Sequence, residues 1–434
     1  MKNRLLVALA ATTLGLSACG GNVHPTLTSG SLLGVRSQSV HKAGQAKWTL
    51  LLHMAADNDL DKFGIEDLNQ MEVGLNNPDV NMIVLYDGWK RGDSCIYKIK
   101  HDASMNGEIV SEKLNDGGAI IDPSTNEIDS GDPKVSAKFA QWAVKQFPAD
   151  RYGMTFWDHG SGLFDPKDKR PNPSRSFCID AKGGFMRTSD LDKILASGVQ
   201  AAGKPFDVLG FDACLMSHVE MAYQAKGLAD FMIASQETEP AAGWDYINLL
   251  KALSANPDMD GAGLGKAAVE TYVNSFKPGG SQNPTNRYLL ATLSCTNIKN
   301  VVTKLTPALN DFARIAMAGY SANKAVLDAV RLDSNYFLNG DCPDLGDFLS
   351  KLDKSSVPTD IKAAGAAVEA ARAGSVVAYG GVGDPKHVAS TGLVIYFPSI
   401  KWSYETYYSD PSKIAFAAEN WKNYLILTHS PKTR

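Results

Sequence analysis

Short apolar runs alternate with amphipathic stretches between residues 46 and 255. An apolar run with few polar positions is typical of a strand buried on both faces, as in a parallel sheet. Five such runs predict strands at 47–55, 80–86, 152–157, 206–211 and 231–235. Apolar residues at helical spacing predict helices at 136–147, 189–200 and 215–228, with Ser189 as the N-cap of the second. The alternation indicates an α/β fold in which helices cover a mainly parallel sheet.

The pattern changes after about residue 255. The elements predicted there are helices at 261–276 and 296–331 and strands at 288–293, 376–379 and 393–397. We therefore divide the folded part of the chain into an α/β domain at 46–255 and a C-terminal α/β extension or subdomain at 256–434. The pattern leaves open whether this second half stands alone or adds strands and helices to the first sheet.

The first residues have the pattern of an export signal. Lys2 and Arg4 precede an apolar run over residues 5–16, which is short for a membrane-spanning helix and fits a secretory signal. The run ends in Leu-Ser-Ala-Cys-Gly, which resembles a bacterial lipobox. We therefore predict a lipoprotein signal peptide over residues 1–19, with a lipid attached to Cys19.

The alternative for this segment is an ordinary signal that is cleaved after Ala18. Residues 20–45 are rich in Gly, Ser and Thr without periodicity, and they predict a flexible tether between the anchor and the domain. Acyl chains on Cys19 would hold the protein at a membrane surface of the bacterial cell envelope.

Composition narrows the class of protein. The chain has 434 residues, of which 44% are hydrophobic and 21% charged, so it can form a packed core and is not disordered as a whole. The formal net charge is −4, which argues against a nucleic-acid partner.

Six cysteines are present, at positions 19, 95, 178, 214, 295 and 342. Their spacing contains no CxxC pair, which disfavours a structural zinc site. Without Cys19 the number is odd, so at least one thiol stays free unless it pairs between chains. This raises the question of whether one cysteine is a nucleophile.

One histidine and one cysteine follow successive predicted strands. His159 comes directly after the strand at 152–157, and Cys214 after the strand at 206–211. Since functional groups gather at the carboxyl ends of parallel strands, the two side chains would meet if the strands are neighbours. Cys214 also precedes a predicted helix, whose N-terminus would favour a thiolate.

This pair suits a cysteine nucleophile with a histidine that protonates the leaving amine. The backbone N–H groups of Gly160 and Cys214 could form an oxyanion hole. The alternative is that Cys214 is a small buried residue and that the His-Gly pair belongs to a turn, since each feature is common by itself.

Three segments resemble the clostripain family of cysteine peptidases. They are WTLLLHMAADNDLD at 48–61, YGMTFWDHGSG at 152–162 and FDVLGFDACLMSHVEMAYQAKGLADFMIASQETEPAAGWDY at 206–246. The resemblance extends over roughly residues 46–255 and more loosely to the C-terminus. It implies a caspase-like three-layer α/β/α sandwich and a dyad of His159 and Cys214. It also implies cleavage after Arg or Lys, activity stimulated by calcium, and maturation by self-cleavage. The chemistry itself needs no cofactor.

The chain departs from the caspase signature, since it has FDAC where caspases have QAC. Specificity for Asp is therefore not expected. Recognition of Arg or Lys needs a carboxylate, and Asp212, two residues before Cys214, is the first candidate. Asp245 is the second, with a turn or helix-cap role as its alternative. Asp158 could orient the imidazole or face away from it.

An acidic group follows the first strand, made up of Asp57, Asp59, Asp61 and Glu66. It could form a cation site or part of the substrate cleft. The loop does not match an EF-hand, because Lys62 stands where that motif has glycine. We favour acids placed near a helix N-terminus, and the sequence assigns no metal ligands.

Residues 164–176 are polar, basic and rich in proline, and predict an exposed loop near the active site. Arg175, followed by Ser176, is the preferred site of self-cleavage, and Lys169 is the second. Arg170 is disfavoured because Pro171 follows it.

The leading functional prediction is thus an endopeptidase that acts on proteins or peptides after Arg or Lys. The alternative is an inactive caspase-like envelope lipoprotein that binds peptides or other proteins.

Overall fold

A single mixed sheet forms the centre of the described part of the chain. The computed structural model describes residues 45–163, 177–338, 340–398, 404 and 406–429. The strands in chain order are β1 (Ala46–Ala55), β2 (Val80–Asp87), β3 (Cys95–Lys98), β4 (Glu112–Leu114), β5 (Ala149–Trp157), β6 (Phe177–Ile179), β7 (Phe185–Met186), β8 (Phe206–Asp212), β9 (Ala229–Ala234), β10 (Ala291–Asn297) and β11 (Val376–Val382).

The α-helices in chain order are α1 (Asp61–Gly74), α2 (Pro133–Gln146), α3 (Leu191–Ala202), α4 (Val219–Gln224), α5 (Tyr246–Ala255), α6 (Gly261–Phe276), α7 (Ile298–Asn300), α8 (Thr306–Asp333), α9 (Leu345–Lys354), α10 (Thr359–Ala373), α11 (Pro385–Val388) and α12 (Asn420–Thr428). Short 3₁₀ segments cover Thr188–Asp190, Thr406–Ser409 and Ala415–Ala418, and a π-helical turn at Val301–Leu305 leads into α8.

The sheet has nine strands in the order β11-β10-β9-β8-β5-β1-β2-β3-β4. Its middle, from β9 to β2, is parallel, and two antiparallel strands extend it at each edge. The mainly parallel sheet that the apolar runs predicted is therefore confirmed.

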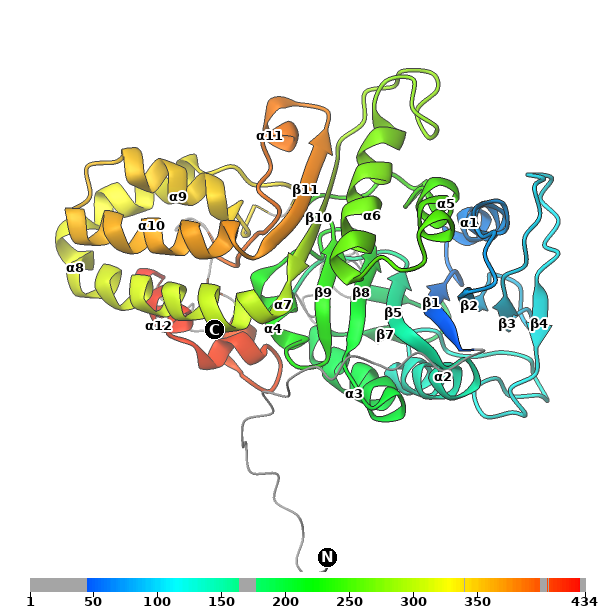
Figure 1. Cartoon of the computed structure of the whole chain (residues 1–434). Helices are drawn as coiled ribbons and strands as arrows, with labels where there is room; N and C mark the ends of the chain where they lie inside the picture. The colour runs from blue at the N-terminus through cyan, green and yellow to red at the C-terminus, as the bar shows by residue number, and fades with distance from the viewer. Residues whose placement is uncertain (1–44, 164–176, 339, 399–403, 405, 430–434) are drawn as a thin grey trace, which may run out of the picture. The chain divides into compact units, whose positions relative to one another are not determined.

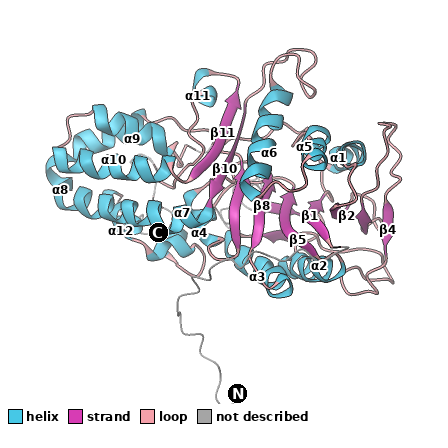
Figure 2. Cartoon of the chain, in the orientation of Figure 1, coloured by secondary structure: helices cyan, strands magenta, loops and turns pink. Residues whose placement is uncertain are grey.

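Helices cover both faces of this sheet, as Figure 1 shows. Helices α1, α5 and α6 lie on one face and α2 and α3 on the other (Figure 2). Successive residues of a strand point to opposite faces, so Leu51 packs into the α2 and α3 side and Leu52 into the α1, α5 and α6 side. Two apolar layers on one sheet make the predicted three-layer α/β/α sandwich.

The C-terminal half joins the first sheet rather than forming a separate one. Strand β10 pairs with β9, and β11 pairs with β10. Apolar residues of α8, α9 and α12 belong to the same cluster as those of α2 and α3, for example Phe312, Phe348 and Trp421. All described residues fall within one compact unit.

Three predicted boundaries are wrong for identifiable reasons. Ser189 lies inside the 3₁₀ turn that precedes α3 and does not cap that helix. The helix predicted at 215–228 shrinks to α4, because the chain just before it pairs with distant backbone: Ser217 N–H donates to Ser235 O and Val219 N–H to Val394 O. The predicted strand at 288–293 begins three residues late, at Ala291.

The predicted strand at 393–397 is extended but makes only isolated bridges, at Val394. In the described ranges, no helix combines the length and apolar character that crossing a bilayer requires.

Candidate active site

The ends of β5 and β8 bring His159 and Cys214 to one place. The two strands are parallel neighbours, and Trp157 pairs with Asp212 at their carboxyl ends. Gly160 then packs directly on the cysteine: a Cβ atom there would lie 2.4 Å from Cys214 O and 3.0 Å from Cys214 N. A larger residue at position 160 would push the two loops apart, so a glycine after His159 is needed for this close approach.

Cys214 differs from the other described cysteines in its exposure. All five described cysteines are free, and Cys214 alone among them is not fully buried. Partial burial raises the pKa of its thiol, while the backbone N–H groups of Glu239 and Gly160 lower it. The Glu239 N–H lies 3.2 Å from Sγ. The sulfur thus has two donors ready for a thiolate, but at rest the proton stays on it.

The helix dipole that the sequence predicted behind Cys214 is absent. Helix α4 begins only at Val219 and has six residues. Cys214 is followed instead by Leu215, whose φ of 64° is in the left-handed region that non-glycine residues rarely adopt. The Leu215 N–H donates to Glu237 O at 3.0 Å, which fixes this turn. Backbone N–H groups rather than a helix therefore surround the sulfur.

The His159 ring is oriented by a residue from another loop. Its Nε2 lies 2.8 Å from Asp59 Oδ1, and the described residues provide no hydrogen bond between the ring and Cys214. This bond lowers the pKa of Asp59. The sequence grouped Asp59 with acids near a helix N-terminus, so its contact with His159 was missed.

Asp158 faces away from the imidazole, which was the second of its two predicted orientations. Its carboxylate accepts from Asn58 Nδ2 at 2.8 Å and from the Ile179 N–H. Burial raises its pKa to about 7. Asn58 also donates to Ala55 O and Ile179 O. Asn58 and Asp158 together thus hold the turn after β1 against the backbone of Ile179.

Three buried carboxyl groups lie beside Cys214 on the α1 and α5 face of the sheet. Asp212 is the predicted one, and Glu239 and Asp67 join it. Asp212 Oδ2 accepts from the Tyr246 hydroxyl at 2.7 Å. Neither carboxyl oxygen of Glu239 has a hydrogen bond of good geometry, although the group lies next to Asp212.

Burial dominates the electrostatics of this acidic trio, Asp67, Asp212 and Glu239. It raises the pKa of Asp212 to about 6, and burial together with the charge of Asp212 raises those of Glu239 and Asp67 well above their usual values. In the described part of the chain, no basic side chain forms an ion pair with any of the three. The trio can therefore accept a cation from outside the chain.

Sequence reasoning missed two members of this trio. Glu239 lies in the QETEP segment just after β9, so an acid at the end of a third parallel strand was a usable signal. Asp67 is a polar residue of α1 whose Oδ2 accepts from Trp157 Nε1 at 2.8 Å. Nothing in the helical pattern distinguished it from a surface acid.

Asp245 has the helix-cap role that was its alternative. It is the N-cap of α5, and its carboxylate accepts from Asn248 N at 3.0 Å, Asn248 Nδ2 at 2.6 Å and Ser281 Oγ at 2.9 Å. With three donors already in place, it has little capacity left for a substrate.

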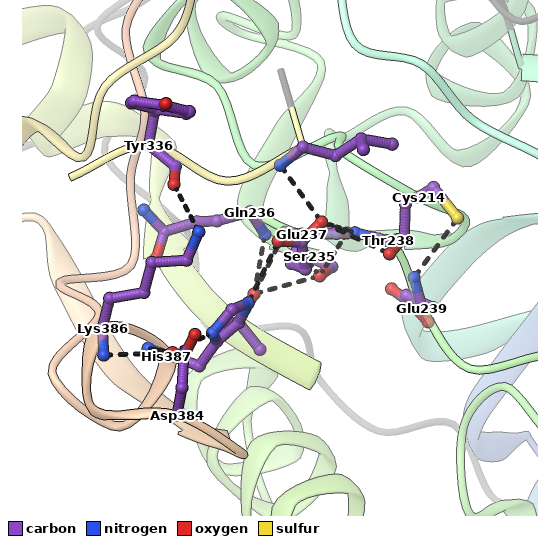
Figure 3. Close-up of polar contacts among 12 residues, drawn as sticks. Cys214, Ser235, Gln236, Glu237, Thr238, Glu239, Tyr336, Asp384, Lys386 and His387 are labelled. Atoms are coloured by element: carbon purple, nitrogen blue, oxygen red, sulfur yellow. Dashed lines mark hydrogen bonds and ion pairs between the residues drawn. The ribbon is translucent and has the colours of Figure 1, made fainter. Parts of the chain in front are cut away.

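The C-terminal half holds the loop that carries Glu239. Figure 3 shows His387 between Asp384 and Glu237, with Nε2 3.0 Å from Glu237 Oε2. Gln236 Nε2 donates to Asp344 Oδ2 at 3.0 Å in the same loop. Residues more than 100 positions further along the chain thus position the Glu239 N–H that points to Cys214 Sγ.

The acids after β1 do not act as one group. Asp61 is the first residue of α1, as expected, and accepts from the Tyr86 hydroxyl at 2.8 Å. Asp59 contacts His159, and Asp57 turns inward to an ion pair with Lys182. The remaining predicted site residues, Cys19, Lys169 and Arg175, lie outside the described residues.

Comparison with known proteins gives one matching family. Residues 52–426 match the model of the Clostripain family. Clostripain from Hathewaya histolytica is 26% identical over 236 residues, which cover 50% of this chain and 44% of that protein. The chain thus aligns with less than half of the length of this relative.

Solved structures share the fold over most of their length. A secreted C11 cysteine protease from Bacteroides thetaiotaomicron, in complex with an irreversible peptide inhibitor, has a TM-score of 0.63 at 20% identity, covering 86% of this chain and 99% of that one. An inactive zymogen C11 protease from Parabacteroides distasonis has a TM-score of 0.58 at 17% identity, covering 82% and 93%.

Proposed function

Because the chain belongs to the clostripain family of cysteine proteases, we propose that it is an endopeptidase that cleaves after Arg or Lys. Cys214 is the nucleophile and His159 the general acid and base in this proposal. The observation that carries the specificity is the acidic trio beside Cys214, which is buried and lacks a basic partner among the described residues.

The trio suits a substrate cation for a physical reason. Buried like charges raise one another's pKa, and an arriving guanidinium or ammonium group would relieve both the repulsion and the loss of solvation. The Tyr272 hydroxyl and Trp244 Nε1 are also buried without hydrogen-bond partners. The pKa of Tyr272 is raised by burial and by the charges of Glu239 and Asp212, so this hydroxyl is close enough to interact electrostatically with the trio.

The chemistry follows from the groups around the sulfur. His159 removes the Cys214 proton, the thiolate attacks the scissile carbonyl, and the same proton passes from His159 to the departing amine. Water then hydrolyses the thioester and frees the cysteine. In this proposal the backbone N–H groups of Gly160 and Cys214 donate to the oxyanion, and Gly160 does pack closely against Cys214. Asp59 would keep His159 from turning away.

We also propose self-cleavage after Arg175, with Lys169 as the second site. Both residues lie in a segment whose flanks, Leu163 and Phe177, are buried near the sheet. An uncleaved segment carrying basic side chains could occupy the acidic trio. A similar fold is found in a protein described as an inactive zymogen, which supports this proposal.

The proposed location is the bacterial cell envelope, with a lipid on Cys19. Its support is the lipobox-like sequence, and the fold is shared with a protease described as secreted. Replacing Cys19 with Ser should release the protein from membranes or block its maturation. Failure of the wild type to incorporate labelled fatty acid would show that the lipobox prediction is wrong.

The test of the function is a panel of fluorogenic peptides with Arg, Lys, Asp or Asn before the reporter. Arg and Lys substrates should be cleaved by the wild type and none by Cys214→Ala. Cleavage after Asp alone would contradict the proposed specificity. Peptide binding without any cleavage by the wild type would instead favour an inactive binding protein.

A further inference from the structure

One buried histidine of the C-terminal half reaches the loop that carries Glu239. His387 lies in α11, is 0% exposed, and has its ring between Asp384 and Glu237 (Figure 3). Nδ1 lies 2.5 Å from Asp384 Oδ1, and Nε2 lies 3.0 Å from Glu237 Oε2. The ring also packs edge-on against Phe337, with 5.4 Å between the ring centroids. These contacts fix the orientation of a histidine that the proposed mechanism does not use.

Both ring nitrogens of His387 face carboxylate oxygens. An ionised carboxylate only accepts hydrogen bonds, so the ring donates from both nitrogens and carries a positive charge. Asp384 also caps α11, where it accepts from the N–H groups of Lys386 and His387. The ring therefore connects α11 on one side to Glu237 on the other through two charge-assisted bonds.

The backbone of the Glu237 loop contacts Cys214 on both sides of the sulfur. The Glu237 carbonyl accepts from the Leu215 N–H at 3.0 Å, which fixes the left-handed residue after the cysteine. Two residues further along the loop, the Glu239 N–H points to Cys214 Sγ at 3.2 Å. A shift of Glu237 would therefore disturb both the turn after the cysteine and the donor to its sulfur.

Glu237 is held by two kinds of partner. The hydroxyls of Ser235 and Thr292 accept from its N–H at 3.1 and 3.2 Å, so the sheet supports its backbone. Its carboxylate accepts from the Leu338 N–H at 3.2 Å and from the His387 ring. In the described part of the chain, His387 is the basic side chain that forms an ion pair with this carboxylate.

We propose that His387 is a positioning residue for the active-site cysteine. By pairing with the Glu237 carboxylate, it keeps the Glu239 N–H on Cys214 Sγ, where this donor favours the thiolate over the thiol. The C-terminal half of the chain thereby sets the reactivity of a sulfur that belongs to the first half.

The charge of the ring acts in the same direction as its position. Burial raises the pKa of the Cys214 thiol most, and the charges of Asp212 and Glu237 add to this effect. A positive ring beside Glu237 offsets one of these two charges. Loss of His387 would therefore disfavour the thiolate twice, by releasing the N–H donor and by exposing the sulfur to the Glu237 charge.

The effect on peptide hydrolysis rests on the proposed function, whereas the effect on the thiol does not. Iodoacetamide reacts with the thiolate, which displaces iodide, so the rate of alkylation reports the reactive form of Cys214 without any peptide. The other four described cysteines are buried. Mass spectrometry of the fragment that contains Cys214 separates its alkylation from that of any other cysteine.

Two substitutions of His387 each keep one of its two bonds. The amide nitrogen of His387→Gln can reach the position of Nε2 and donate to Glu237, whereas the shorter amide of His387→Asn reaches only the position of Nδ1, beside Asp384. Alkylation of Cys214 at pH 7 should slow about tenfold in His387→Asn, which is about the value of one hydrogen bond to a charged group. His387→Gln loses only the charge, so its rate should lie between that of His387→Asn and that of the wild type.

Lys386→Met is the matched control. Lys386 is the neighbouring residue in α11, and its ammonium donates to Tyr336 O at 2.9 Å rather than to the Glu237 loop. This change removes a charge and an anchor of α11 but leaves the bond between His387 and Glu237. Alkylation of Cys214 should therefore match that of the wild type, with any loss of stability seen only in the melting temperature.

The order of the rates decides the proposal. Equal alkylation of the wild type and His387→Asn would overturn it. Slower alkylation of His387→Gln than of His387→Asn, or an equal loss in Lys386→Met, would also overturn it, because the anchoring of α11 would then matter rather than the bond to Glu237. If His387→Asn does not fold, an unchanged rate in His387→Gln overturns the charged pairing.

Activity assays on the same proteins separate this inference from the proposed function. The expected order of alkylation rates in a protein that hydrolyses no peptide would support the role of His387 and contradict the proposed function. A wild-type peptidase whose kcat/KM falls in the variants in the same order as the alkylation rate would support both.

Discussion

Two sets of three buried carboxyl groups lie on opposite faces of the same sheet. Asp212 points to the face of α1 and α5 together with Val208, and Asp87 to the face of α2 and α3 together with Leu85. Both sets sit near the carboxyl ends of parallel strands. Composition alone does not distinguish them, yet their surroundings differ.

The group of Asp57, Asp87 and Asp180 has hydroxyls and an ammonium close by: Ser94 Oγ lies 2.5 Å from Asp87 Oδ1, and Lys182 contacts Asp57. The acidic trio is lined instead by aromatic groups and the Cys214 sulfur, and no basic side chain among the described residues reaches it. The first set therefore already has a cation from the chain itself, whereas the second is, under the proposed function, free to receive the cation of the substrate. The neighbours of each set, not its carboxylates, make this difference.

The largest effect should come from changing the two proposed catalytic residues. Cys214→Ala should abolish peptide hydrolysis, and His159→Ala should lower kcat/KM at least about 10²-fold, the lower range for a lost general acid or base. Neither change removes a carboxylate of the acidic trio, so binding of Arg peptides should persist. Steady-state kinetics and calorimetry with an Arg peptide on the same preparations check this. Full activity in either variant would show that the dyad is assigned incorrectly.

The next effect should separate the two faces. Asp212→Asn keeps an acceptor for Tyr246 but removes charge, and leaving a buried charge pair half made costs about 2–5 kcal/mol. We expect kcat/KM on Arg and Lys substrates to fall by about 30-fold or more, with the carboxyl groups on the other face unchanged.

Asp245→Asn is the matched control for Asp212→Asn. It changes an N-cap, so it should cost about 0.5–2 kcal/mol of stability at most, seen as a lower melting temperature, and leave specificity intact. Equal losses of kcat/KM on Arg substrates in both variants would contradict the assignment of Asp212 to recognition of the substrate cation.

The pH dependence of substrate binding should come from Asp212 in the acidic trio. Burial raises the pKa of Asp212 to about 6, so this carboxyl is protonated below that pH and ionised above it. A substrate cation binds the ionised form, and KM for Arg peptides should therefore fall as the pH rises from about 5 to about 7. Initial rates over this range would measure it, with Asp212→Asn giving a flatter curve. A KM that rises with pH would contradict the proposed pairing.

The smallest effect is expected from weakening the contact between Asp59 and His159. Asp59→Asn weakens the contact with His159, but both side chains are largely exposed, at 82% and 40%. An exposed pair contributes at most about 1 kcal/mol, so kcat should fall about fivefold or less. KM should not change, because the exposed Asp59 is not among the buried acids proposed to bind the substrate cation. A change confined to KM would mean that Asp59 contacts the substrate instead.

Much of the site could be predicted because strand ends are visible in the sequence. The apolar runs ended at Asp158-His159 and near Asp212-Ala213-Cys214, and their parallel pairing followed from the α/β pattern. The environment of the cysteine could not be predicted this way. The segment after Cys214 has helical periodicity, but Ser217 and Val219 pair with backbone from β9 and residue 394, and tertiary pairing overrode local preference.

The sequence by itself determined the family and the main order of strands and helices, and it supplied the proposed reacting pair, because these depend on local periodicity and on motifs of adjacent residues. Only the tertiary structure decided which acids matter. Asp57, Asp59 and Asp61 are close neighbours in the chain, yet one enters a buried carboxylate group, one contacts His159 and one begins a helix. Burial and the supply of donors set the behaviour of a carboxylate, and both arise from residues far away along the chain.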